Sequence, residues 1–548
     1  RGLGALLAGL VPADQPFEQE LPFRTCGIML ECSRNAVSQV AYLKQWLRRM
    51  ALLGYNWVML YTKDIYELPA EPYFGYLRGR YTLAEIQELD AYAAALGIEM
   101  SACLQALGHL EPVLKWPAYA MIRDTSSVMM VGKEESYQLV EKMIQFWSRA
   151  LRSRRIHVGL DETHDLGRGR YLDLHGYRRG FDLFNTHLRR VVRICRSYDL
   201  QPMIWSDMYF RLGSRNMDYY DPQSRIPQDV VRRIPRQVNL VYWDYYHADK
   251  NFYLEWIERH RRMGFEPVMA SGIWTWGRLW HDASLTSANA GACLEACRQT
   301  GIRDVFFTMW GDDGNYCDFD SALAGLVFVA EKAITGQTRP AVLAKWLQAI
   351  SGAQYKVTQM ASQLNSIASG PAVLWDDPLL GIYLHNLRAT RPAAWAKLDS
   401  RYRRLALQLA PWRQETGAGS IEHAWRLANL LALKTRLHRQ LCTAYFNQDR
   451  RALSRIRRDI PAVMTALAEV ADSFRTNWLR RYKPFGLEVL QIRLAGLQAR
   501  LAELTDRLDD YQAGCIEVIE ELEANHRAPR SNIAHPSYQN MAHTSYLL

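Results

Sequence analysis

Two adjacent carboxylates, Asp161 and Glu162, directly follow a short apolar run. Apolar residues alternate with smaller or polar ones over residues 156–160, and this pattern predicts a short buried strand. Acidic groups at a strand end are costly to desolvate unless they pair with a partner or act as general acids and bases. An Asp-Glu pair can also cap a helix N-terminus, and the two residues alone leave both interpretations open.

The elements around this pair repeat as a strand followed by a helix. About eight such units fall within roughly 300 residues, the number that a (β/α)8 barrel needs. The predicted strands are continuous apolar runs, as parallel strands buried on both faces are. They cover residues 26–32, 56–61, 98–104, 156–160, 202–207, 238–244, 267–273 and 304–310. The expected fold class is α/β, with a (β/α)8 TIM barrel followed by an all-α domain.

Polar and aromatic side chains gather where the predicted strands end. In β/α barrels the carboxyl ends of the strands carry the active site. Helix capping does not account for so many acids and tryptophans at one rim, so the Asp161–Glu162 pair is interpreted as functional. The rim residues are Glu31, His109, Asp161, Glu162, Asp207, Asp244, Trp274, Trp276, Asp312 and Asp313.

From about Gln337 the strand signals end, and apolar residues recur at helical spacing. One long pattern runs over residues 485–524. Residues 1–10 resemble the last helix of a preceding domain. The helical region could form one side of a cleft or the subunit interface of a homodimer. The expected domains are 1–22, a remnant or linker; 23–336, the catalytic barrel; 337–526, an α-helical domain; and 527–548, a flexible tail.

Composition narrows the classes of partner. The chain has 548 residues, of which 49% are hydrophobic and 23% charged, as in ordinary globular proteins. The net charge of +10 comes mostly from arginine, but there is no basic block with interleaved aromatics, so no nucleic-acid partner is expected. No apolar run is long enough to span a membrane. Nine cysteines without framework spacing predict free thiols in a reducing compartment such as the cytoplasm.

Several segments resemble glycoside hydrolase family 20, the β-N-acetylhexosaminidases, in the branch whose barrel precedes a helical domain. They are CGIMLECSRN, the Gly108–His109 turn, HVGLDETHDLGRGRY, IWSDMYF, YWDYYH, SGIWTW and MWGDDGN. The resemblance implies an exo-acting, retaining enzyme that removes terminal β-linked GlcNAc or GalNAc from oligosaccharides or glycoconjugates, without metal or cofactor. In this family the 2-acetamido oxygen of the substrate attacks the anomeric carbon, so no enzyme nucleophile is needed.

The resemblance implies separate roles for the two acids. Glu162 is the general acid and then the general base, with a pKa that the Asp161 charge is expected to raise. Asp161 is expected to accept the acetamido N–H and to offset the positive charge of the oxazolinium-like intermediate. A tyrosine hydroxyl steadies the acetamido oxygen. Tyr245 is preferred over Tyr246 because it shares strand parity with Trp243.

A wider set of residues is expected to bind or support the sugar. Tryptophans are expected to form the acetamido pocket and the sugar platform, and acids to accept hydrogen bonds from sugar hydroxyls. Asp207 and His164 are expected to orient the acid pair. The predicted substrate-binding residues are Glu31, His109, Trp243, Trp274, Trp276, Trp310 and Asp313.

The sequence also departs from the family pattern. Cys26 takes the place of an arginine that grips the sugar O3 and O4, and Asn315 and Tyr316 occupy a region where many members have a glutamate. These differences leave the choice between GlcNAc and GalNAc open. Two alternatives remain: a barrel glycosidase with a protein nucleophile, such as Asp313 opposite Glu162, and a catalytically inactive carbohydrate-binding protein.

Overall fold

The computed structural model describes residues 1–14, 18–527, 538 and 541. Within them, eight parallel strands close into a barrel in which each strand pairs with the next and β1 pairs with β8. The predicted α/β barrel is therefore confirmed. The strands are β1 (Thr25–Glu31), β2 (Trp57–Tyr61), β3 (Glu99–Cys103), β4 (Arg155–His157), β5 (Gln201–Trp205), β6 (Asn239–Trp243), β7 (Val268–Gly272) and β8 (Asp304–Met309).

Large side chains fill the barrel. Every residue of β1 is buried, as expected for a parallel strand covered on both faces. The ring of Phe306 lies 5.3 Å from that of Trp57 and 5.9 Å from that of Trp205. The indole N–H of Trp57 donates to Ser101 Oγ at 2.7 Å, which satisfies its one polar atom.

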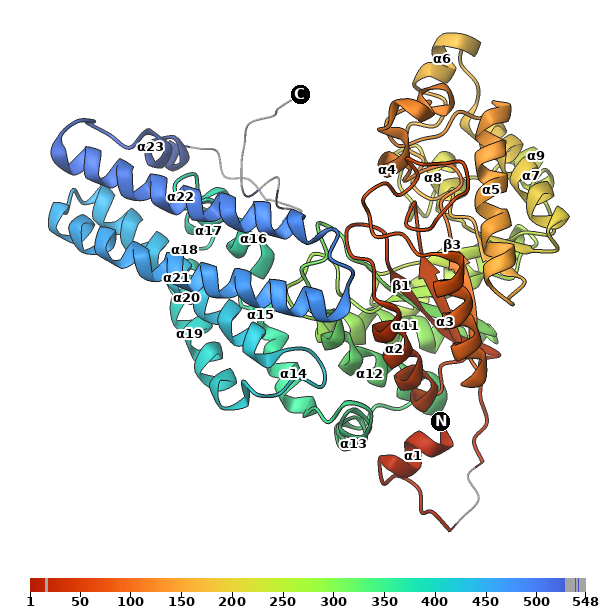
Figure 1. Ribbon diagram of the computed structural model, residues 1–548, viewed down its shortest axis with the longest axis horizontal. Helices are drawn as coiled ribbons and strands as arrows, with labels where there is room; N and C mark the ends of the chain where they lie inside the picture. Colours follow the sequence, from red (N-terminus) through yellow and green to blue (C-terminus); the bar gives the residue numbers. More distant parts are fainter. Residues whose placement is uncertain (15–17, 528–537, 539–540, 542–548) are drawn as a thin grey trace. The chain divides into compact units, whose positions relative to one another are not determined.

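Helices and short helical turns connect the strands (Figure 1). The boundaries follow local signals: Thr82 and Glu85 form a capping box at the start of α3, and Gly54 ends α2 in the left-handed conformation. The elements are α1 (Gly2–Leu7), α2 (Val40–Leu53), α3 (Leu83–Ala95), α4 (Glu111–Leu114), η1 (Pro117–Ile122), α5 (Glu134–Ala150), α6 (Arg170–His175), α7 (Gly180–Ser197), α8 (Asp207–Gly213), α9 (Gln228–Arg232), α10 (Lys250–Arg262), α11 (Ala283–Thr300), η2 (Phe319–Ala322) and α12 (Leu323–Thr335).

The rest of the described chain is helical. The pattern over residues 485–524 is not one helix, because Gly514 adopts φ +79° and ends α22. The helices are α13 (Pro340–Ser351), α14 (Tyr355–Ala361), α15 (Gln363–Ser366), α16 (Gly370–Trp375), α17 (Ile382–Thr390), α18 (Pro392–Trp395), α19 (Leu398–Leu409), η3 (Ala410–Trp412), α20 (Ile421–Phe446), α21 (Arg450–Arg481), α22 (Leu487–Ala513) and α23 (Glu520–Arg527).

The chain forms two compact units. One contains residues 1–273, 284–309 and 327–339, and the other contains residues 274–283, 310–326 and 340–548. The segments that follow β7 and β8 therefore fold with the C-terminal helices. The predicted domain boundaries, drawn at single points along the chain, stay a prediction. Most of the predicted tail, 527–548, lies outside the described residues.

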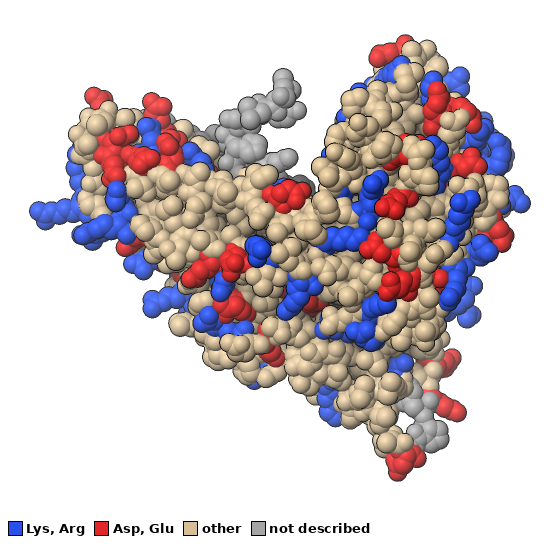
Figure 2. All heavy atoms as spheres, viewed as in Figure 1, with Lys and Arg blue, Asp and Glu red and all other residues tan. Residues whose placement is uncertain are grey.

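Basic and acidic side chains are interspersed on the face of the molecule shown in Figure 2. All nine cysteines are free; eight are buried and Cys515 is exposed. Among the described residues, no helix combines the length and apolar character needed to cross a membrane.

Candidate active site

The backbone bends where β4 ends, and this bend presents the two carboxylates. The strand stops at His157, so the predicted strand over 156–160 is too long. Gly159 and Leu160 adopt φ angles of +73° and +71°, which no regular strand contains. A Cβ at position 159 would lie only 2.7 Å from Gln105 Cδ, so this bend requires glycine.

The loop after β3 packs against the same bend. A Cβ on Gly108 would lie 2.9 Å from the carbonyl oxygen of Asp161 and 2.7 Å from Thr163 Cγ2. Glycine therefore permits the close approach of the two loops. The next residue, His109, has φ +53°, and its ring reaches the carboxylates.

His109 bridges the acid pair. Its Nε2 lies 3.1 Å from Asp161 Oδ2 and 3.4 Å from Glu162 Oε2. Gln105 Nε2 donates to Asp161 Oδ1 at 2.8 Å and to the hydroxyl of Tyr61 at 2.9 Å. The Asp161 side chain is 12% exposed and that of Glu162 is 37% exposed. Asp161 is thus fixed on both oxygens, whereas Glu162 can be reached from solvent.

The bridge determines the charges of the three groups. Burial acts against ionisation of Asp161, but the His109 charge and the hydrogen bonds from His109 and Gln105 lower its pKa to about 2. Burial alone would lower the pKa of His109, but the Asp161 charge and the hydrogen bonds raise it to about 9. Burial and the Asp161 charge raise the pKa of Glu162, yet the hydrogen bond and charge of His109 bring it below its ordinary value. The expectation of a raised pKa for Glu162 is therefore wrong in this structure.

Further polar groups contact Glu162. Asp207 Oδ2 accepts the Glu162 backbone N–H at 3.0 Å, and burial together with the Asp161 charge raises the pKa of Asp207 to about 8. The Tyr219 hydroxyl donates to Glu162 Oε1 at 3.3 Å and also contacts His164 Nε2. Asp207 thus contacts the backbone of Glu162 directly, whereas His164 is linked to the Glu162 side chain through the Tyr219 hydroxyl. Their orienting roles stay a prediction.

An aromatic stack continues from Tyr219. Its ring lies 5.4 Å from Trp243, which stacks on Tyr245 at 5.2 Å with an interplanar angle of 22°. Tyr245 is 5% exposed, whereas Tyr246 is 56% exposed. Ring contacts through Tyr219 therefore connect Trp243 and Tyr245 to Glu162. The roles of Trp243 and Tyr245 in binding the substrate stay a prediction.

The carboxylate of Glu31 is already engaged. Its Oε1 accepts from Ser33 N at 2.8 Å and Ser33 Oγ at 2.7 Å, and its Oε2 pairs with the guanidinium of Arg34. The Glu31 side chain is 1% exposed and that of Arg34 is 25% exposed. Arg34 is consequently the more accessible group at the end of β1.

Four of the predicted residues belong to the other compact unit: Trp274, Trp276, Trp310 and Asp313. Trp274 and Trp276 stack at 4.2 Å with an interplanar angle of 19°. Trp310 O accepts from Thr275 Oγ1 at 2.8 Å. Asp313 Oδ1 lies 3.6 Å from Arg493 Nη1, and its Oδ2 accepts from Tyr538 N at 2.8 Å. Sugar binding by these residues stays a prediction.

Sequence reasoning missed three residues with direct partners in this site. Gln105 lies just beyond the end of β3, separated from it by Leu104, so its position near the strand end was an available signal. Arg34 follows the end of β1 in the same way. Tyr219 lies in a loop after α8 without periodicity, and only the folded chain reveals its contact with Glu162.

Comparison with known proteins finds one family model and two relatives that are similar to parts of this chain. Residues 353–536 match the Glycoside Hydrolase 20C C-terminal domain. Hexosaminidase D of Homo sapiens is 28% identical over 252 residues, which is 43% of this chain and 49% of that protein. Hexosaminidase D of Bos taurus is 28% identical over 257 residues, covering 43% of this chain and 68% of that protein. The chain thus spans about half the length of the human relative.

Two bacterial proteins are among the solved structures that resemble this chain. The β-N-acetylhexosaminidase from Bacteroides fragilis is 16% identical with a TM-score of 0.45, covering 57% of this chain and 65% of that one. The Flavobacterium johnsoniae chitobiase is 14% identical with a TM-score of 0.47, covering 80% and 75%. Residues 353–536 are thus similar to a C-terminal domain of glycoside hydrolase family 20, and the chain is similar to two mammalian proteins named hexosaminidase D.

Proposed function

We propose that this chain is a retaining, exo-acting β-N-acetylhexosaminidase that removes a terminal β-linked GlcNAc or GalNAc. The observation that carries the proposal is the pair of adjacent carboxylates bridged by His109, one fixed and ionised and the other accessible. The names of the curated relatives support the same activity.

The first step uses the two acids differently. Asp161 accepts the acetamido N–H of the sugar and orients the acetamido oxygen toward the anomeric carbon. That oxygen forms a bond to the anomeric carbon while the bond to the leaving oxygen breaks, and Glu162 protonates the leaving oxygen. The charge of Asp161 offsets the positive charge of the oxazolinium intermediate.

His109 supplies the proton that Glu162 needs. Glu162 is ionised near neutral pH, whereas His109 carries a proton and its Nε2 lies 3.4 Å from Glu162 Oε2. Transfer along this contact loads Glu162 before it protonates the leaving group. In the second step Glu162 accepts a proton from water, and the water oxygen bonds to the anomeric carbon while the bond from that carbon to the acetamido oxygen breaks. This restores the acetamido group and gives a product of retained configuration.

The test is hydrolysis of 4-nitrophenyl N-acetyl-β-glucosaminide and galactosaminide. We expect Glu162→Gln to lower kcat by about 10²- to 10⁴-fold and Asp161→Asn by about 10²- to 10³-fold. Asp165→Asn, which removes a carboxylate from the same loop, is the control and should keep the wild-type rate. Full activity of Glu162→Gln on both substrates would contradict the proposal.

Hydrolysis of 4-nitrophenyl β-glucoside, which lacks the acetamido group, distinguishes the proposed mechanism from a glycosidase with a protein nucleophile. A barrel glycosidase with a protein nucleophile would hydrolyse this substrate, because it does not need the acetamido group. Substrate-assisted catalysis predicts turnover of the acetamido sugars only. Binding of GlcNAc without any turnover would indicate an inactive carbohydrate-binding protein.

A further inference from the structure

Three aromatic side chains form a cluster on the loops that follow β2 and β3. The ring of Trp116 lies 5.4 Å from that of Tyr73 and 5.6 Å from that of Tyr76, and the two tyrosine rings are 5.8 Å apart. Tyr73 is 42% exposed and Tyr76 is 44% exposed. We call these three residues the aromatic triad. Such exposed aromatic clusters mark binding surfaces more often than isolated surface residues do.

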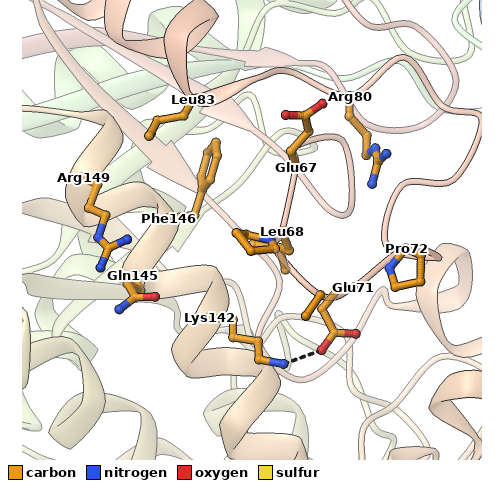
Figure 3. A pocket seen from close by; sticks show the side chains of 12 residues that line it. Glu67, Leu68, Glu71, Pro72, Arg80, Leu83, Lys142, Gln145, Phe146 and Arg149 are labelled. Atoms are coloured by element: carbon orange, nitrogen blue, oxygen red, sulfur yellow. Dashed lines mark hydrogen bonds and ion pairs between the residues drawn. The ribbon is translucent and has the colours of Figure 1, made fainter.

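The loop that carries the two tyrosines is fixed at its start. Glu71 Oε1 accepts from Lys142 Nζ of α5 at 2.7 Å, the contact drawn in Figure 3, and Glu71 Oε2 accepts from the Tyr119 hydroxyl at 2.9 Å. This part of the loop also forms one wall of a cavity of about 630 Å³ whose opposite wall includes Phe146 and Arg149. Contacts with α5 and with Tyr119 therefore fix the start of this loop.

The same loop is fixed at its end. Arg78 Nε donates to the buried Asp64 Oδ1 at 2.9 Å, and Arg78 Nη1 donates to the carbonyl oxygen of Arg34 at 3.0 Å. Arg80 Nη1 donates to the carbonyl oxygen of Phe74 at 3.0 Å. These bonds hold the tyrosines in place before any ligand arrives, which lowers the ordering cost of binding.

The aromatic triad lies close along the chain to the residue that bridges the acid pair. Only Leu110 separates the bridging residue His109 from the start of α4, and Trp116 follows one residue after Lys115, the C-cap of α4. The four residues of α4 advance the chain by about 6 Å. Lys63 Nζ lies 3.7 Å from Glu111 Oε2 at the start of α4, and the Asp161 charge acts on Lys63. One short helix therefore connects the bridging residue His109 with Trp116 of the triad.

We propose that the aromatic triad is a second carbohydrate-binding surface, which holds sugar residues on the leaving-group side of an oligosaccharide. The inference rests on the proposed hexosaminidase activity. Aromatic rings offer flat apolar faces to the C–H groups of a pyranose, and a tyrosine adds a hydroxyl that can bond to sugar hydroxyls. Rigid aromatic side chains also lose little conformational entropy on binding.

The experiment compares substrates of different length. Wild-type kcat/KM should rise from the β-1,4-linked GlcNAc dimer to the tetramer. We expect Tyr76→Ala and Trp116→Ala to lower kcat/KM on the tetramer by about 3- to 10-fold and to leave the 4-nitrophenyl substrate unchanged. Tyr76→Phe keeps the ring and should retain most of the preference for the tetramer. Tyr198→Ala, at the end of α7 just before β5, is the matched control and should change neither substrate.

The outcomes separate this inference from the proposed function. Equal losses on both substrates, or none on either, would overturn the binding surface while leaving the hexosaminidase intact. Absence of turnover of the 4-nitrophenyl substrate by the wild type would overturn the proposed activity. In that case calorimetric titration with the tetramer still tests the triad, since Tyr76→Ala should weaken binding by the same factor and unchanged binding would refute it.

Discussion

His109 connects the two acids chemically, and its protonation should set the pH range of activity. Asp161 must stay ionised, so the rate should fall only as the pH approaches about 2. His109 must stay protonated, so the rate should fall as the pH rises through about 9. A broad plateau between these limits is the expected profile of kcat/KM.

Replacing the bridge should narrow this plateau. In His109→Gln the cation that lowers the pKa of Glu162 is gone, and Glu162 must hold its own proton. We expect the basic limb of kcat/KM on the 4-nitrophenyl substrate to move well below pH 9. His175→Gln, on α6, is the control. A basic limb that stayed at its wild-type position would show that His109 is not the proton source.

At the level of elements, the bend after β4 can be tested with two glycines. Gly159 and Gly97 have nearly the same φ, +73° and +71°, but a Cβ would approach Gln105 only at position 159 and meets nothing within 4 Å at position 97. Both alanine variants should have an unfolding free energy lower by about 1–2 kcal/mol, because alanine is strained in the left-handed backbone conformation.

Only Gly159→Ala should also lose activity, because displacement of Gln105 releases one oxygen of Asp161. We expect kcat/KM to fall about 100-fold, as for misplacement of a catalytic group by about 1 Å. Thermal unfolding and kinetics on both variants check the two effects separately. Equal activities would mean that the bend does not position the acid.

The same elements show which features of the structure can be predicted from the sequence and which cannot. The barrel is predictable because parallel strands that are buried on both faces have continuous apolar sequences. The bend is not, because Leu160 and Glu162 take left-handed angles that their residue types do not favour. The pKa of Glu162 depends on His109, which lies on another loop. The local sequence pattern around Glu162 does not predict that this histidine contacts it. Helices α14–α17, of 4 to 9 residues, are too short to show a period.

In the molecule as a whole, a buried ion network ties the segment after β8 to the end of α21. Arg481 Nη2 lies 2.8 Å from Asp318 Oδ1, and Arg481 Nε lies 2.8 Å from Asp320 Oδ2, with all three side chains at most 6% exposed. Arg481→Met removes the buried cation that pairs with both carboxylates. We expect the unfolding free energy in urea to fall by about 3–5 kcal/mol.

The neighbouring arginine provides the control for this network. Arg480 Nη2 also approaches Asp320, at 3.9 Å, but its side chain is 49% exposed. Arg480→Met should therefore cost about 1 kcal/mol or less. Equal costs for the two variants would show that burial does not determine the strength of the pairing.

The membership of residues 274–283 in the helical unit has a consequence for synthesis on the ribosome. The Trp280 indole N–H donates to the carbonyl oxygen of Thr358 at 3.2 Å, and that acceptor is translated 78 residues later. Leu279 N likewise awaits Asn365 Oδ1, 3.0 Å away in the finished protein. A tryptophan-rich stretch is thus synthesised well before its partners, so its apolar side chains have no native packing during this interval.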